Sequence, residues 1–347
     1  NTTHRRTAGN PLVHTQHLKC WANHFGDDES GRHRVHANSA VGPFTTELQG
    51  QVTQRALGSG VRDDVGFVCS TAHDRTDVDD VAALAERLDA PVCVGYQHND
   101  AFPGSHPLFA GPLGYNGSKA GMELISRADV VVALGTRLNP FSTLPGYGID
   151  YWPVNAKIIQ VDINPDRIGL TKPVSVGIVG DAKKVAQGLL ARLSDTAGDA
   201  GREERKNLIA TTKSAWAQEL TSMDHEDDDP GTTWNQRARA DKPDWMSPRM
   251  AWRAIQSALP KEAIISSDIG NNCAIGNAYP SFDEGRKYLA PGLFGPCGYG
   301  LPSIVGAKIG QPHVPVVGFA GDGAFGIAVN ELTAIGRDEW PAVTQIV

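Results

Sequence analysis

Residues 314–325 read VPVVGFAGDGAF, an apolar run followed at once by an aspartate between two glycines. The run predicts a buried strand, and residues 325–335 predict a helix. In open α/β sheets, ligands bind outside the carboxyl ends of the strands. Gly321 and Gly323 let the backbone turn and approach a ligand closely, the start of a helix suits phosphate oxygens, and Asp322 offers a hard oxygen for Mg²⁺. A lone Gly-Asp-Gly is also an ordinary turn, but this setting predicts a metal-chelated phosphate site.

The same pattern occurs upstream. Residues 263–267 predict a strand that ends at Asp268, and three polar or flexible residues follow it, namely Gly270, Asn271 and Asn272. A glycine-rich stretch then covers residues 292–300 and leads into a predicted helix at 302–309. Another helix is expected from Ser247-Pro248, a helix cap followed by proline, to about Ala258. Residues 342–347 predict one more buried strand.

Residues 76–195 form a second region of alternating strands and helices. Strands are expected at 91–94, 130–134 and 157–163, helices at 78–88, 119–126 and 182–193, and a loop at 99–117. The alternation predicts parallel sheets covered on both faces. The chain is therefore expected to be α/β, with two doubly wound parallel-sheet domains at 76–195 and 246–347. No Gly-x-Gly-x-x-Gly follows either long strand, so a Rossmann-type dinucleotide site is not supported.

Two segments lack this order. Residues 1–75 hold seven of the eleven histidines with no persistent period, which favours an irregular, non-native leader over a histidine-rich metal site; the histidines are His4, His14, His17, His24, His33, His36 and His73. Residues 196–245 predict an exposed helix at 202–220 followed by an acidic linker. The acidic run DHEDDDP at 224–230 fits a solvated linker better than a metal site.

Composition excludes several classes of function. The net charge is -7 without a basic stripe, so nucleic acid is not an expected partner. No apolar run approaches the roughly 20 residues of a membrane span, and the five cysteines form no CxxC pair. These features favour a cytoplasmic protein. Because the chain starts at Asn1 and stops at Val347 within an apolar run, we expect a fragment.

Residues 247–347 resemble the cofactor domain of the acetolactate-synthase-like thiamine-diphosphate enzymes, and residues 77–195 are similar to the middle domain of that family. The likeness rests on Asp268 to Asn272, on the loop 293–302 (LFGPCGYGLP) and on GDGAF at 321–325. It implies Mg²⁺ on Asp322 and an enzyme that is a homodimer or homotetramer. It places around thiamine diphosphate the residues Asp268, Gly270, Asn271, Asn272, Gly295, Cys297, Gly321, Gly323 and Ala324.

Within that family, three segments look like those of one branch, namely residues 96–102 (YQHNDAF), 271–277 (NNCAIGN) and 295–299 (GPCGY). Its members convert sulfoacetaldehyde and phosphate into acetyl phosphate and sulfite during taurine degradation. An acetolactate-synthase-type carboligase with FAD in its middle domain is the first alternative. A non-catalytic fragment of either enzyme is the second.

The chain also departs from the family pattern. Cys297 stands where members often place Met or Leu, so packing is favoured over a reactive thiol. The family's catalytic Glu has no visible counterpart in residues 1–75, Glu331 cannot replace it, and the family's second metal ligand falls past Val347. The catalytic residue is therefore unknown, and the fragment alone is expected to be inactive. Arg137 is a candidate for the sulfonate by position only, and a surface salt bridge is favoured for it.

Overall fold

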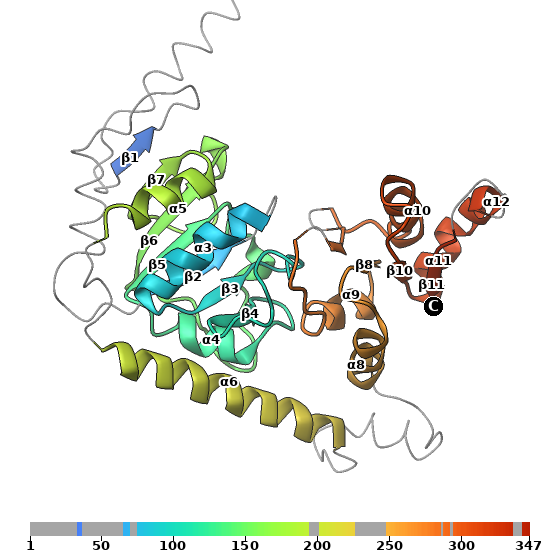
Figure 1. Cartoon of the computed structure of the whole chain (residues 1–347), viewed down its shortest axis with the longest axis horizontal. Coiled ribbons are helices and arrows are strands. Elements are labelled where there is room, and N and C mark those ends of the chain that lie inside the picture. Colours follow the sequence, from blue (N-terminus) through green and yellow to red (C-terminus); the bar gives the residue numbers. More distant parts are fainter. Residues whose placement is uncertain are drawn as a thin grey trace, which may run out of the picture.

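The computed structural model describes residues 33–36, 65–69, 75–193, 201–225, 248–285, 287–291, 294–335 and 342–347. Within these ranges the chain builds two separate parallel sheets with helices around them (Figure 1). The expected α/β class with two parallel-sheet domains is confirmed.

The sheet of the middle domain has seven strands in the order β1-β7-β6-β5-β2-β3-β4, and each neighbouring pair is parallel. From β2 the chain moves outward through β3 to β4, then returns to the other side of β2 at β5, so the sheet is doubly wound. All five residues of β5 are buried, as expected for a central strand covered on both faces. The strands are β1 (His33–His36), β2 (Val65–Cys69), β3 (Val92–Val94), β4 (Phe109–Pro112), β5 (Val130–Leu134), β6 (Lys157–Asp162) and β7 (Val176–Val179).

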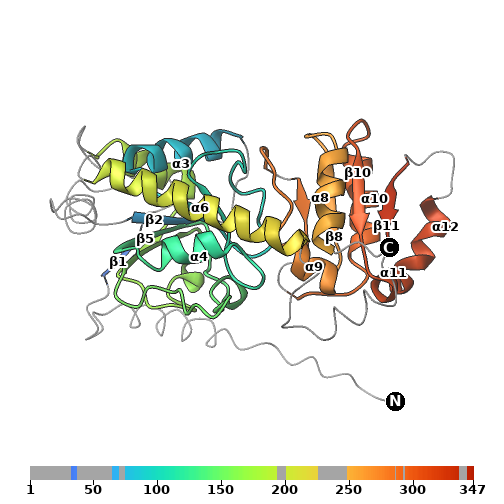
Figure 2. The same ribbon diagram turned by 90° about the horizontal axis from the view of Figure 1, so that it is seen from below.

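The helices of this domain are α3 (Arg75–Leu88), α4 (Lys119–Ile125), α5 (Ala182–Leu190) and α6 (Arg202–His225), with short 3₁₀ turns η3 (Pro140–Ser142) and η4 (Pro165–Arg167). Figure 2 shows α3 and α4 on opposite sides of the strands. Side chains cap two helices: Ser118 Oγ accepts from the Gly121 N–H at the start of α4, and Asp181 Oδ1 accepts from the Lys184 N–H in α5.

Four strands of the middle sheet lie where no strand was expected, namely β1, β2, β4 and β7. β1 and β2 fall inside residues 1–75, so the irregular segment expected there does not hold at these two places. β2 is only five residues long and is defined by its pairing with β3 and β5, which sequence periodicity cannot show. β4 lies inside the expected loop 99–117, because its sequence FAGP contains turn residues that an edge strand tolerates. Apart from the two in β1, the N-terminal histidines lie outside the described residues.

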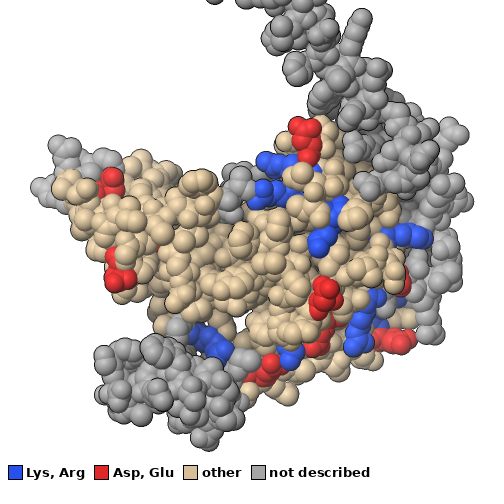
Figure 3. All heavy atoms as spheres, turned by 180° about the vertical axis from the view of Figure 1, so that it is seen from behind, with Lys and Arg blue, Asp and Glu red and all other residues tan. Residues whose placement is uncertain are grey.

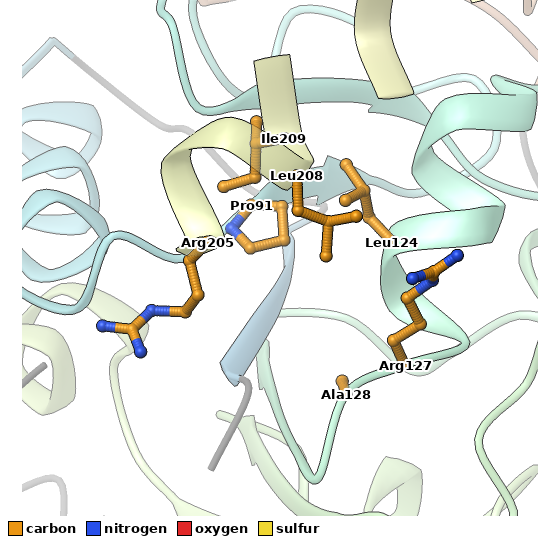
Figure 4. A pocket seen from close by; sticks show the side chains of 7 residues that line it. All are labelled: Pro91, Leu124, Arg127, Ala128, Arg205, Leu208 and Ile209. Carbon is orange, nitrogen blue, oxygen red and sulfur yellow. The ribbon is translucent and has the colours of Figure 1, made fainter. Parts of the chain in front are cut away.

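The helix α6 is less exposed than its sequence suggests. It runs beneath the middle domain in Figure 1 and packs beside α4, where Arg205 and Ile209 are buried. Lys119 and Glu219 pair at 2.7 Å across this seam, and Tyr147 contacts Trp216 edge to face. The acidic run beyond His225 lies outside the described residues. Figure 4 shows a small hollow in the seam, lined by Pro91, Leu124, Arg127, Ala128, Arg205, Leu208 and Ile209.

The second sheet has four parallel strands in the order β11-β10-β8-β9. Ile265 and Val317 face a cluster with Trp252 of α8, while Ile264 and Val316 face a cluster with Ile304 of α10. This period-2 alternation gives the sheet two apolar faces, and a helix covers each. The elements are α8 (Pro248–Ala258), β8 (Ile264–Ser267), α9 (Asn271–Gly276), β9 (Tyr288–Leu289), α10 (Gly300–Gly310), β10 (Val316–Phe319), α11 (Asp322–Ala328), η5 (Val329–Glu331), α12 (Leu332–Ile335) and β11 (Thr344–Ile346).

Local differences appear here too. Residues 271–276 form the helix α9, which was not expected, and α11 begins at Asp322 rather than at Phe325. β11 was expected to be buried, but it lies at the sheet edge with Thr344 exposed. The expected helix cap Ser247 lies outside the described residues. Among the helices described, none combines the length and apolar content needed to cross a membrane.

Candidate cofactor site

The candidate site lies at the carboxyl edge of the second sheet. β8 and β10 are paired so that Ser267 lies opposite Phe319, and the Asp268 N–H donates to the Phe319 carbonyl at 2.7 Å. The two strands therefore release Asp268 and the Gly321-Asp322-Gly323 turn at neighbouring positions. The structure brings together the two motifs that the sequence places more than fifty residues apart.

Asp268 is almost completely buried, with 1% of its surface exposed. Its Oδ1 accepts from the N–H groups of Ile269 (2.8 Å) and Gly298 (3.0 Å), and its Oδ2 accepts from the Gly300 N–H (2.6 Å). A carboxylate with three backbone donors is firmly held, because each bond is charge-assisted. The structure thus shows Asp268 as the anchor of the glycine-rich loop. A direct contact of Asp268 with the cofactor stays a prediction.

The helix α9 follows Asp268 and carries two further predicted residues. Gly270 precedes it with φ 134° and ψ -165°, a conformation that essentially only glycine adopts. Asn272 donates through Nδ2 to the carbonyls of Asp268 (3.0 Å) and Phe319 (3.3 Å), so its amide ties the first turn of α9 to the ends of both strands. Asn271 is exposed at the same end. The side chains of Asn271 and Asn272 therefore both lie beside the candidate site, and the hydrogen bonds of Asn272 also hold the backbone around it.

The glycine-rich loop reaches across the site between β8 and α11. Gly295 lies against Ile269, and Gly298 lies against Ile327 and the Ala324 carbonyl of α11. Both glycines have positive φ, 64° and 86°. Residues 292 and 293, at the start of this loop, lie outside the described residues. The site residues expected from the sequence did not include Gly298 and Gly300, although the repeated glycines of this loop were a signal that could have indicated them.

Replacing Gly298 by alanine should destabilise the protein by about 1–3 kcal/mol, because a left-handed non-glycine residue is strained. The added Cβ would also lie 2.9 Å from Ile327 Cγ2. Gly306→Ala is the matched control, since Gly306 lies inside α10 with open space around its Cβ position. Alanine there should raise the free energy of unfolding by roughly 0.5–1 kcal/mol. Denaturant unfolding measures both. Equal effects from the two changes would contradict the packing described for Gly298.

The start of α11 presents the metal-motif residues. Asp322 is the first residue of the helix and is exposed, and Gly321 and Gly323 have open space where a side chain would begin. Ala324 is buried beneath them. The N–H groups of a first helical turn have no acceptor within the helix, so they face outward free to bind an anion. The open backbone and the exposed carboxylate together fit a diphosphate with its metal.

The donor set for a metal is small. Among the described residues, no three His, Cys, Asp or Glu side chains cluster as a metal centre. Both carboxylate oxygens of Asp268 already accept hydrogen bonds from backbone N–H groups. Mg²⁺ commonly takes only one or two carboxylates and completes its octahedron with phosphate oxygens and water. The Asp322 carboxylate beside a diphosphate therefore fits part of such a coordination shell.

Cys297 lies exposed on the glycine-rich loop, whereas Cys93 and Cys273 are buried. We expect iodoacetamide to modify Cys297 at least about tenfold faster than either buried thiol, because buried thiols react only after local opening. Thiamine diphosphate with Mg²⁺ should slow this modification if the loop covers the cofactor. Peptide mapping by mass spectrometry measures each site. If Cys297 were modified equally fast with and without the cofactor, this residue would lie outside the site.

Arg137 lies in the other domain, just after the carboxyl end of β5. Burial lowers the pKa of this guanidinium, and the charge of Arg167 lowers it further. In the part of the chain that the structure describes, no carboxylate pairs with Arg137, so the expected salt bridge is not found there. A role in binding sulfonate stays a prediction.

On one face of the molecule (Figure 3), the charged side chains that the structure describes do not gather into a patch of one sign. On the face shown in Figure 3, basic and acidic residues are intermingled over the middle domain, and much of the cofactor-binding domain shows neither kind.

Known families match both halves of the chain. Residues 67–189 match "Thiamine pyrophosphate enzyme, central domain", and residues 268–347 match "Thiamine pyrophosphate enzyme, C-terminal TPP binding domain". The chain belongs to the thiamine pyrophosphate enzyme family, and its second domain is the thiamine-pyrophosphate-binding one. The resemblance inferred from the motifs is confirmed at this level.

Individual relatives are more specific. The chain is 87% identical over 266 residues to a sulfoacetaldehyde acetyltransferase from Roseovarius nubinhibens, a match that covers 77% of this chain and 44% of the relative. It is 76% identical over 308 residues to a probable sulfoacetaldehyde acetyltransferase from Rhizobium meliloti, covering 89% and 51%. A probable acetolactate synthase large subunit from Methanocaldococcus jannaschii is 32% identical over 270 residues, covering 76% and 42%. The chain spans about half the length of the curated relatives it matches.

Proposed function

We propose that the protein containing this chain is a thiamine-diphosphate- and Mg²⁺-dependent acyltransferase that converts sulfoacetaldehyde and phosphate into acetyl phosphate and sulfite. The observation that carries the proposal is the 87% identity to a protein named sulfoacetaldehyde acetyltransferase. The alternative, an acetolactate-synthase-type carboligase, is less well supported, because the corresponding identity is only 32%.

The geometry of the site supports the cofactor part of this proposal. When bound, thiamine diphosphate supplies a carbanion that adds to aldehyde carbons. The chain's own share would be to bind and orient the cofactor: the first turn of α11 would hold the diphosphate, and Asp322 would hold Mg²⁺. Asp268 fixes the loop through Gly298 and Gly300, so that the loop presents a rigid backbone to the cofactor ring. Cys297, which is exposed on that loop, would pack against the ring.

We also propose an assembly state and a cellular location for the protein. We infer a homodimer or homotetramer, because apolar side chains are exposed beside the site, among them Phe294, Ile327 and Leu332. Burial against another part of the assembly would remove them from water. A cytoplasmic enzyme of taurine degradation is consistent with the cysteine pattern and with the proposed substrate.

The decisive experiment is an assay of the natural full-length protein with sulfoacetaldehyde, phosphate, thiamine diphosphate and Mg²⁺. We expect sulfite and acetyl phosphate in equal amounts, and no product when either cofactor or phosphate is omitted. The 347-residue chain by itself should release no sulfite. Acetolactate formed from pyruvate, together with a flavin absorbance band and no sulfite, would refute the proposal in favour of the carboligase.

A further inference from the structure

The middle domain and the cofactor-binding domain are joined by a buried polar junction. Two segments of the chain meet there, residues 96–99 after β3 and residues 273–280 in and after α9. Hydrogen bonds connect residues about 180 positions apart. These are two of the segments that carry the resemblance to the sulfoacetaldehyde branch.

Asn277 lies at the centre of the junction and is completely buried. Its Oδ1 accepts from the Gln97 N–H at 2.8 Å, and its Nδ2 donates to the Tyr115 carbonyl at 2.9 Å. Its own carbonyl accepts from Asn99 Nδ2 at 2.8 Å. Three hydrogen bonds to three different places on the middle domain fix both the position and the rotation of this residue.

The neighbours of Asn277 reinforce the junction. Asn99 uses its second N–H on the Pro280 carbonyl at 3.0 Å. Gln97 donates through Nε2 to Cys273 Sγ, and the Tyr96 hydroxyl lies 3.4 Å from the same sulfur. Burial raises the pKa of the Cys273 thiol and that of the Tyr96 phenol, so both stay uncharged near neutral pH. The junction therefore combines neutral polar groups whose hydrogen bonds are directional.

Gln97 adopts φ 64°, a left-handed conformation that is rare for a residue with a side chain. Such a conformation persists only where the surroundings determine it. Here it aims the Gln97 N–H at Asn277 and the side chain at Cys273. The backbone of the middle domain is thus shaped around α9.

The helix α9 links this junction to the candidate cofactor site. It is only six residues long. Its first turn is tied by Asn272 to the carbonyls of Asp268 and Phe319 at the ends of β8 and β10. Its third residue, Cys273, and the residue that caps its end, Asn277, are tied to the middle domain through Gln97. A shift at one end of so short a helix must move the other end.

We propose that Asn277 and Asn99 are positioning residues for the cofactor site: by tying α9 to the middle domain, they set where Asn271, Asn272 and the backbone around Asp268 lie. This inference rests on the proposed function only in assigning thiamine diphosphate to the site. It makes the middle domain part of the machinery that orders the cofactor site, although none of its residues named here touches that site.

The test compares Asn277→Ala and Asn99→Ala with Asp283→Ala in the natural full-length protein. Asp283 is the matched control, because its Oδ1 accepts from the Ser105 N–H across the same domain boundary but it lies outside α9. Titration calorimetry with thiamine diphosphate at saturating Mg²⁺, well below the unfolding temperature, should show about tenfold weaker binding for Asn277→Ala. Asn99→Ala should bind several-fold more weakly, and Asp283→Ala within about twofold of the parent protein.

Two further measurements separate positioning from plain stability. Deuterium exchange at residues 268–272 should speed up in both asparagine variants and not in Asp283→Ala. With saturating cofactor, kcat should recover to within about threefold while the KM for thiamine diphosphate stays raised. Unchanged binding and exchange in a folded Asn99→Ala or Asn277→Ala protein would overturn the proposal. A parent protein that binds the cofactor but releases no sulfite would instead refute the proposed reaction and leave this test valid.

Discussion

Replacing Asp322 by asparagine should weaken the Mg²⁺-dependent binding of thiamine diphosphate by at least about 100-fold, because even residues that only support a metal ligand contribute 10- to 100-fold. Asp322 is the one carboxylate that the described residues place at the start of α11. Asparagine keeps the size and the hydrogen-bonding oxygen but removes the negative charge. The diphosphate would then share its metal with a neutral amide, which Mg²⁺ binds far more weakly than a carboxylate.

The stability of the protein should hardly change, since Asp322 is exposed and surface substitutions usually alter the free energy of unfolding by less than about 0.5 kcal/mol. Asp150→Asn is the matched control, an exposed aspartate in a loop of the middle domain. Titration of Mg²⁺ at fixed thiamine diphosphate measures the effect, and high Mg²⁺ should restore part of the binding. Binding by Asp322→Asn that equals the Asp150→Asn control would mean that Asp322 holds no metal.

The strands that end at the candidate site could be predicted well from the sequence, and the reason is physical. Apolar runs such as residues 314–319 define buried strands locally, and the glycines beside Asp322 mark where the chain must turn. The placement of this motif at the edge of a parallel sheet follows from those local signals. The structure confirms both strands, β8 and β10, and shows in addition that they are paired neighbours.

Elements that depend on distant partners could not be predicted in this way. β2 is a strand because β3 and β5 lie on either side of it, and its five residues carry no period long enough to reveal this. α9 was missed because six residues beginning after a glycine look like a loop. The junction around Asn277 joins segments about 180 positions apart, so no local pattern contains it.

Asp268 shows the same limit within the site. Its place after β8 could be predicted from the sequence, but the direction of its carboxylate depends on Gly298 and Gly300, which come 30 and 32 residues later. Sequence reasoning assigned the side chain to the cofactor. The structure shows both of its oxygens occupied by the loop.

Replacing Asp268 by asparagine should therefore destabilise the protein by roughly 3 kcal/mol, because one buried charge-assisted acceptor is lost and a buried donor is left unpaired. Asparagine can still accept from Ile269 or Gly298 through its oxygen. Its NH₂ group would then face the Gly300 N–H, so that two donors meet where a 2.6 Å hydrogen bond existed. The loop 294–300 should loosen, and binding of thiamine diphosphate should weaken in consequence.

Denaturant unfolding, together with deuterium exchange at residues 294–301, measures the two effects separately. Asp283→Asn is the control: this aspartate also accepts a backbone N–H, from Ser105 at 3.0 Å, but it is exposed and asparagine keeps its accepting oxygen. Its stability should change by less than about 1 kcal/mol. If Asp268→Asn kept its stability and its slow exchange but lost cofactor binding, the carboxylate would act on the cofactor directly. If Asp268→Asn instead lost stability, slow exchange and cofactor binding together, Asp268 would be the anchor that shapes the loop. Only a loosened loop links exchange at Gly300 to binding at α11.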